Sequence, residues 1–124
     1  MENKKKILIV EDDSKMQMAL AEFFSSDGFD VVKASDGEEG IVLAKKENPD
    51  IILLDIILPK KDGYEVVSDL KSEETTKNIP VVILTNLGSV NDVEKAIKLG
   101  ATTYLVKSEY GLEEIVKKVK EIIK

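Results

Sequence analysis

The segment DIILLD, residues 50–55, decides the fold, because four consecutive apolar residues stand there between two acids. A short run of this kind, rich in isoleucine, is typical of a strand buried on both faces of a parallel sheet. Four similar runs occur elsewhere in the chain: ILIV (7–10), FDVV (29–32), PVVIL (80–84) and TYLV (103–106). The sequence therefore predicts five short buried strands.

The segments between these runs carry the start and stop signals of helices. Three pairs resemble capping boxes: Ser14 with Gln17, Ser35 with Glu38, and, more loosely, Asp62 with Glu65. Gly28 and Gly100 stand where helices are expected to end. The final segment places apolar residues at helical spacing: Leu112, Ile115, Val116, Val119, Ile122 and Ile123.

Five alternations of strand and helix predict an α/β fold with a parallel sheet covered by helices on both faces. Right-handed crossovers leave few topologies. We expect the flavodoxin-like, doubly wound (βα)5 sandwich with strand order 2-1-3-4-5, formed as a single domain by residues 1–124. In this order a ligand site is expected at the carboxyl ends of strands 1 and 3.

Composition excludes several classes of function. The 124 residues include no cysteine and no histidine, which removes thiolate and imidazole chemistry from this chain. A net charge of −6 argues against direct nucleic-acid binding, which needs basic surface. The first apolar run, residues 7–10, is too short for a signal peptide or a membrane span, so we expect a cytoplasmic protein without a membrane partner.

Polar groups follow the expected strands at the predicted ligand edge. Glu11 and Asp12 follow the first strand, Asp55 the third, Thr85 ends the fourth and Lys107 the fifth. Two carboxylates about 4 Å apart repel by about 4 kcal/mol at an effective dielectric near 20, so such a cluster favours a cation. Oxygen ligands suit Mg²⁺, lysine suits phosphate oxygens, and carboxylates are known phosphoryl acceptors. The set predicts a magnesium site beside a nucleophilic aspartate.

Each residue also has a plainer interpretation. An acid after a strand is usually a helix cap, which we expect of Asp13. Thr85 fits a cap and Lys107 a solvated side chain, whereas Asp55 lies between apolar residues and is harder to explain in this way. Their convergence on one sheet edge favours a functional site.

These residues resemble the receiver domain of bacterial two-component response regulators, such as the chemotaxis regulator. The resemblance extends from KKILIVEDD through DIILLDIILPKKDGYEVV and VVILTNLG to GATTYLVKS. It implies that Asp55 accepts a phosphoryl group from a phosphohistidine. It also implies that Glu11, Asp12, Asp55 and the Ile57 carbonyl hold Mg²⁺, and that Lys107 contacts the phosphoryl oxygens.

The resemblance further implies a switch. Thr85 would swing toward the phosphoryl group, Tyr104 would turn inward, and residues 89–123 would change their surface; otherwise Tyr104 is a half-exposed strand residue. The implied partners are a histidine kinase or phosphotransfer protein and a downstream protein, with the chain a monomer or a phosphorylation-dependent dimer. Such a domain is not an enzyme acting on free substrate, and it stands alone or belongs to a longer regulator.

The chain departs from the family pattern in three ways. Ser108 replaces a proline that usually follows the lysine, and Asn86 replaces a small residue after the threonine. Ile57 and Leu87 are apolar two places beyond Asp55 and Thr85, which suggests slow loss of the phosphoryl group. A flavin-binding module, an aspartate-dependent phosphatase and a receiver that is never phosphorylated remain alternatives. The acidic EDDSKMQ loop and the apolar Ile57 disfavour the first two.

Overall fold

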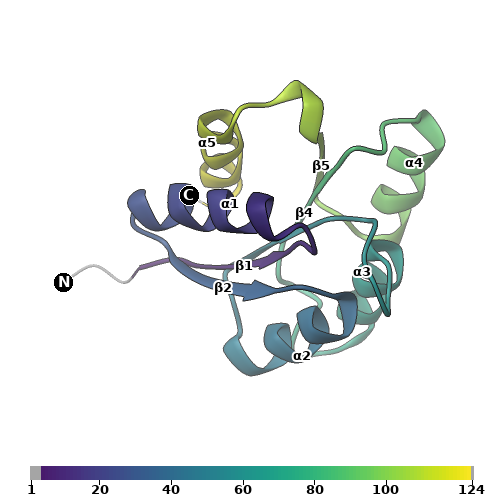
Figure 1. The fold of residues 1–124 in the computed structure, drawn as a ribbon. Coiled ribbons are helices and arrows are strands. Elements are labelled where there is room, and N and C mark those ends of the chain that lie inside the picture. Colours follow the sequence, from purple (N-terminus) through teal and green to yellow (C-terminus); the bar gives the residue numbers. More distant parts are fainter. Residues whose placement is uncertain (1–3, 124) are drawn as a thin grey trace.

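The computed structural model describes residues 4–123 and contains five strands and five α-helices in strict alternation (Figure 1). The strands are β1 (Lys6–Val10), β2 (Asp30–Ala34), β3 (Ile51–Leu54), β4 (Val81–Thr85) and β5 (Thr103–Val106). The helices are α1 (Ser14–Ser26), α2 (Gly37–Glu47), α3 (Gly63–Ser72), α4 (Val90–Leu99) and α5 (Leu112–Ile123), with a 3-10 turn at Lys107–Glu109.

The strands form one parallel sheet in the order β2-β1-β3-β4-β5, which confirms the predicted doubly wound fold. In β3, Leu54 pairs with Val10 of β1 and with Ile83 of β4. The winding reverses between β1 and β3, so these two central strands end side by side.

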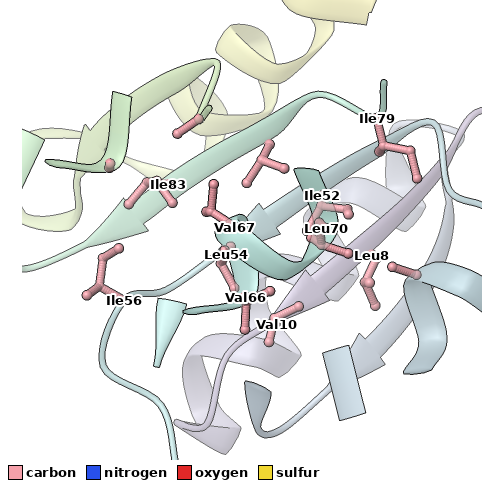
Figure 2. Close-up of a cluster of buried hydrophobic side chains, with 14 of the residues drawn as sticks. Leu8, Val10, Ile52, Leu54, Ile56, Val66, Val67, Leu70, Ile79 and Ile83 are labelled. Carbon is pink, nitrogen blue, oxygen red and sulfur yellow. The ribbon is translucent and has the colours of Figure 1, made fainter. Parts of the chain in front are cut away.

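Alternating side chains of the sheet build two separate cores. On one face Leu8, Val10, Ile52, Leu54 and Ile83 pack against α2, α3 and α4, and Figure 2 shows this cluster around Val66, Val67 and Leu70. On the other face the intervening strand residues pack against α1 and α5: Ile7, Ile9, Leu53, Val82, Leu84 and Leu105. Because both faces are covered, the central strands are apolar except at their ends, where Lys6 begins β1 and Thr85 closes β4.

The two edge strands differ from the prediction of full burial. In β2 only Ala34 is buried, and in β5 only Leu105 is buried. Each edge strand has a single strand neighbour, so its side chains are less completely covered than those of β1, β3 and β4.

The helix ends correct two of the predicted caps. Asp13 caps α1 by accepting from the backbone of Lys15 and Met16, which confirms the cap expected of Asp13 and corrects the capping box predicted for Ser14. Asp36 rather than Ser35 caps α2. An aspartate immediately beside each serine takes the cap position, where its negative charge is favourable at the positive end of the helix dipole.

The remaining start and stop signals were placed correctly. Asp62 and Glu65 form a complete capping box at the start of α3. Gly28 and Gly100 adopt left-handed backbone angles, φ +94° and +118°, after α1 and α4. The predicted last helix is α5.

The described chain enters and leaves the fold at the same edge of the sheet. β1 begins at Lys6, and α5 runs back from the end of β5 toward this edge (Figure 1). The Lys120 ammonium in α5 lies 2.9 Å from the Asp27 carboxylate, directly after α1. Among residues 4–123 no helix is long and apolar enough to cross a membrane.

Candidate functional site

The predicted site residues meet at the carboxyl edge of the sheet. Glu11 directly follows β1 and Asp55 directly follows β3. The Glu11 amide donates to Ala34 O at 3.0 Å, and the Asp55 amide donates to Val10 O at 3.0 Å. These bonds continue the sheet pairing one residue beyond the strands and fix where the two acidic side chains begin.

Glu11, Asp12 and Asp55 form one carboxylate cluster. One oxygen from each lies within 4.8 Å of the other two. Glu11 is only 3% exposed and Asp55 only 7%, whereas Asp12 is open to solvent. Two nearly buried acids and one exposed acid therefore share a single point at the end of β1 and β3.

Lys107 inserts its ammonium between the two buried acids. Its Nζ lies 2.6 Å from Glu11 Oε1 and 2.9 Å from Asp55 Oδ2. The other Glu11 oxygen accepts from the Asp13 amide at 3.1 Å, and the other Asp55 oxygen accepts from the Ile57 amide at 3.3 Å. Both buried carboxylates are thus satisfied on both oxygens, as buried charges require.

The pKa values follow from burial and from this pairing. Burial raises the pKa of Glu11 above its usual range, although the hydrogen bond with Lys107 opposes this. For Lys107 burial alone lowers the pKa, but the hydrogen bonds with Asp55 and Glu11 outweigh it, so its pKa is raised. Lys107 therefore stays charged, and its charge holds the two acids together.

The donor set fits a small, hard cation. Three carboxylates and one ammonium leave a charge of −2 at the cluster, matching a divalent ion. All the side-chain ligands available are oxygens, since the sequence lacks cysteine and histidine. Oxygen-only sites with an exposed side suit Mg²⁺, which keeps several of its waters. The cluster can therefore hold a divalent metal ion.

Thr85 and Tyr104 meet at the backbone of Leu87. The fully buried Thr85 hydroxyl accepts from the Leu87 amide at 3.5 Å. The half-buried Tyr104 hydroxyl donates to Leu87 O at 2.6 Å. Thr85 and Tyr104, the two residues expected to form the switch, therefore both hydrogen-bond to the backbone of Leu87, just after β4.

The departures from the family pattern have distinct surroundings. Ile57 is 58% exposed beside Asp55, and Asn86 is exposed. Leu87 is half-buried and packs against the apolar cluster under α3 and α4. Within residues 4–123 every peptide bond is trans, including the one between Lys107 and Ser108.

Two sets of side-chain contacts were not predicted from the sequence. The Tyr64 hydroxyl in α3 donates to Asp92 Oδ1 in α4 at 2.9 Å, and the Lys95 ammonium lies 4.1 Å from the Tyr64 ring centroid. Gln17, expected to complete a capping box, instead sends its side chain to Glu11 and Ala34. These contacts join separate chain segments, and no local pattern signals them.

The chain also has an open groove of about 710 Å³ between α1 and α5, and most of the residues that line it are charged. Its lining includes Phe23, Val116 and Lys120 but none of the residues of the carboxylate cluster. The groove is therefore separate from the strand-end chemistry.

Comparison with known proteins agrees with this arrangement. The family model described as the response regulator receiver domain matches residues 7–120. The chain belongs to this family. A receiver domain is the signalling module of a response regulator, so the family and the fold agree with the geometry at the carboxyl edge.

Several named proteins resemble this receiver domain. It is 37% identical over 122 residues to the probable transcriptional regulator ycf27 of Cyanophora paradoxa, covering 98% of this chain and 49% of that protein. The solved Vibrio cholerae chemotaxis protein CheY4 has a TM-score of 0.90 and 27% identity, covering 96% of this chain and 98% of that one. A Borrelia burgdorferi complex of CheX and CheY with BeF3 and Mg²⁺ scores 0.88 at 31% identity, covering 97% and 90%.

The chain spans about half the length of the curated relatives that it matches, but nearly the whole length of the solved receiver domains. Regulation of transcription by those longer relatives is therefore not carried over to this chain.

Proposed function

We propose that this receiver domain accepts a phosphoryl group on Asp55 from the phosphohistidine of a histidine kinase or phosphotransfer protein. The observation that carries the proposal is the position of the Asp55 carboxylate. It lies nearly buried, 2.9 Å from the Lys107 ammonium and beside two further acids. A carboxylate in such a place can act as a nucleophile, and the cationic side chain offsets charge on the incoming group.

The residues that would hold Mg²⁺ are Glu11, Asp12 and Asp55, together with the carbonyl of Ile57. The cluster of three acids supports the first three, and the ion in the related Borrelia burgdorferi complex supports the choice of metal. When bound, Mg²⁺ would neutralise negative charge on the phosphoryl oxygens and the carboxylates. Asp12, the exposed acid, is proposed as a direct ligand.

The transfer itself exchanges one bond to phosphorus for another. An Asp55 oxygen forms the new bond to phosphorus while the bond to the imidazole nitrogen of the donor breaks, and the imidazole keeps that electron pair. Lys107 is placed to contact the phosphoryl oxygens, since its ammonium already lies against Asp55 Oδ2. The product is an aspartyl phosphate on this chain, so the domain turns over no free substrate.

The proposed output is a change in the surface formed by α4, β5 and α5. A phosphoryl oxygen on Asp55 offers the Thr85 hydroxyl a charged acceptor, which makes a stronger bond than its present contact with the Leu87 amide. Because Tyr104 holds the carbonyl of the same Leu87, both contacts would respond together. The domain would thereby shift between two pre-existing states.

The proposal includes a downstream protein that recognises the shifted surface, with the domain acting as a monomer or as a phosphorylation-dependent dimer. It treats residues 1–124 as one receiver domain located in the cytoplasm, where a kinase with ATP would supply the phosphoryl group. The acids beside β1 disfavour a flavin phosphate, because they would repel it unless a metal ion intervened.

Intact-protein mass spectrometry after incubation with acetyl phosphate tests the proposal. The wild type is expected to gain one phosphoryl group with Mg²⁺ present and none with EDTA. Asp55→Ala is expected to gain none. The matched control is Asp50→Ala, because Asp50 stands at the other end of β3 and its carboxylate accepts from the Lys6 amide at 2.8 Å.

Asp50→Ala should be phosphorylated like the wild type. A folded wild type that binds Mg²⁺ yet gains no phosphoryl group from acetyl phosphate or from a histidine kinase would favour a receiver that works without phosphorylation. Modification of Asp55→Ala to the wild-type extent would assign the acceptor to another residue.

A further inference from the structure

The side chain of Gln17 ties together the two loops beside the carboxylate cluster. Its Nε2 donates to Glu11 O at 3.0 Å and to Ala34 O at 2.9 Å, and lies 3.4 Å from Ser35 Oγ. Gln17 is half-buried in the first turns of α1, and its own amide donates to Asp13 O at 2.9 Å. One residue thus contacts the loop after β1 and the loop after β2.

The chemistry of this contact requires a donor. Backbone carbonyls only accept hydrogen bonds, and a glutamine amide nitrogen carries two hydrogens. The two shorter contacts use both hydrogens, so the nitrogen must face the carbonyls and the amide oxygen must face away. A carboxylate or a thioether at this position would leave Glu11 O without this partner.

The carbonyl of Glu11 belongs to the peptide group that precedes Asp12. On the far side of Asp12, the Asp13 amide donates to Glu11 Oε2 at 3.1 Å, and Asp13 caps α1. The exposed Asp12 side chain is not held by surrounding packing. The direction of its backbone therefore depends on the hydrogen bonds made by the neighbouring residues. Gln17 supplies the bond on the Glu11 side.

We propose that Gln17 is a positioning residue for the metal site, holding the Glu11–Asp12 peptide so that both carboxylates point at one cation. This inference rests on the proposed Mg²⁺ site. Gln17 does not touch the metal; it acts through the loop that carries two of its ligands. Partners of this outer kind change metal affinity by about 10- to 100-fold when removed, so loss of the Gln17 amide is expected to raise the Mg²⁺ Kd about tenfold.

The test is a titration of the metal-free protein with MgCl2, followed by backbone amide chemical shifts in NMR. It compares the wild type with Gln17→Met, which keeps the length and helix preference of the side chain and removes the donors. The expected result is an Mg²⁺ Kd about tenfold higher for Gln17→Met. The affinity is measured without any phosphoryl donor.

The matched control is Thr76→Val. The buried Thr76 hydroxyl donates to Leu70 O at 2.7 Å between α3 and β4, at the opposite edge of the sheet. Gln17→Met removes two side-chain bonds to backbone carbonyls and Thr76→Val removes one, so both are expected to lower Tm. Only Gln17→Met is expected to change the Mg²⁺ Kd, which separates positioning from a general loss of stability.

An Mg²⁺ Kd for Gln17→Met equal to that of the wild type would overturn the inference and leave the metal site intact. A wild type that shows no Mg²⁺-dependent shifts would instead overturn the proposed metal site. Should Gln17→Met not fold, Gln17→Ala replaces it, because alanine has no side-chain donor and reaches neither carbonyl. A wild-type Kd for Gln17→Ala would equally overturn the inference.

Discussion

The Lys107 ammonium lies 2.6 Å from Glu11 Oε1, in a pair where Glu11 is 3% and Lys107 15% exposed at the side chain. The same ammonium contacts Asp55, so one cation pairs with two acids that would otherwise repel each other at the end of β1 and β3. Its place in the structure makes Lys107 a stabilising residue as well as a proposed contact for the phosphoryl group.

Replacement of Lys107 by methionine is therefore expected to cost stability. Lys107→Met should lower the free energy of unfolding by about 1–3 kcal/mol in EDTA, because hydrogen bonds to buried charged groups are lost. Saturating Mg²⁺ should stabilise this variant more than the wild type, since a bound cation replaces the missing charge. Urea unfolding with and without MgCl2 measures both effects. The control is Lys118→Met on the exposed side of α5, and equal stability of the two variants in EDTA would contradict the prediction.

Gly63 is the first residue of α3, and it packs against the backbone of Asp55 and Ile56, just after β3. Its amide donates to Ile56 O at 2.7 Å, and a Cβ added there would stand 2.5 Å from Asp55 O and 2.6 Å from Ile56 Cα. Gly63→Ala is expected to lower the free energy of unfolding by about 1–3 kcal/mol, the usual cost of overpacking. It should also slow modification by acetyl phosphate, because the backbone of Asp55 must shift.

The control for Gly63→Ala is Gly111→Ala. There the nearest atom to an added Cβ is Glu114 Oε1 at 3.7 Å, an ordinary contact. Urea unfolding and the mass-spectrometric rate should distinguish the two alanine variants. A Gly63→Ala protein as stable as Gly111→Ala would contradict the prediction. It would mean that the loop between β3 and α3 accommodates the added methyl group at little cost in free energy.

The phenol of Tyr64 should titrate late. Burial, the hydrogen bond to Asp92 and the charge of Asp92 raise the pKa of Tyr64 to about 12. Since this folded-state pKa exceeds the ordinary value of about 10, the stability linked to Tyr64 is fully present below pH ~10 and is lost as the pH rises toward 12. Phenolate absorbance of the wild type minus that of Tyr64→Phe gives its titration, with circular dichroism monitoring the fold.

Asp92→Asn tests the cause of that shift. Removing the carboxylate removes two of the three largest contributions to the raised pKa. Tyr64 should then titrate at a lower pH than in the wild type while the fold persists. A wild-type midpoint near 10 in folded protein would contradict the contact between α3 and α4.

The exposed side chain of Ile57 should slow hydrolysis of an aspartyl phosphate. Its amide contacts Asp55 Oδ1 at 3.3 Å, and its apolar side chain offers no hydrogen bond to a water approaching Asp55. Ile57→Ser is expected to speed loss of the phosphoryl group about fivefold, which corresponds to about 1 kcal/mol in the barrier. Mass spectrometry over time, after removal of acetyl phosphate and with Mg²⁺ retained, measures the rate.

Val42→Ser is the control for Ile57→Ser, since Val42 is 61% exposed on α2 and Ile57 58% exposed. The control should keep the wild-type lifetime. An unchanged lifetime in Ile57→Ser would mean that water reaches Asp55 from another direction.

Much of this arrangement was predictable because each buried strand is marked in the sequence by a short apolar run. The apolar run before Asp55 marks β3, and the strand order then places Asp55 beside Glu11 and Asp12. The capping pairs were less reliable: two aspartates beside the predicted serines took the caps of α1 and α2. In each case the observed cap lies one residue from the predicted serine.

Contacts between distant segments were not predictable. Ser14 and Gln17 have the spacing that a capping box requires, yet the side-chain amide of Gln17 donates to the carbonyl of Ala34, 17 residues away. Tyr64 and Asp92 are separated by 28 residues and meet only because α3 and α4 pack side by side. Such pairs depend on how the helices pack on the sheet. No periodicity or residue spacing in a single sequence indicates them.

The entry of β1 and the exit of α5 at one edge, with Lys120 bound to Asp27, have a practical consequence. A flexible tether joined before Lys6 or after Ile123 leaves the molecule on the side away from Asp55. The domain can therefore be anchored to a biosensor chip by either end with its acidic edge facing the flowing solution. Kinase encounter and Mg²⁺ exchange could then be followed on the immobilised protein with little obstruction from the support.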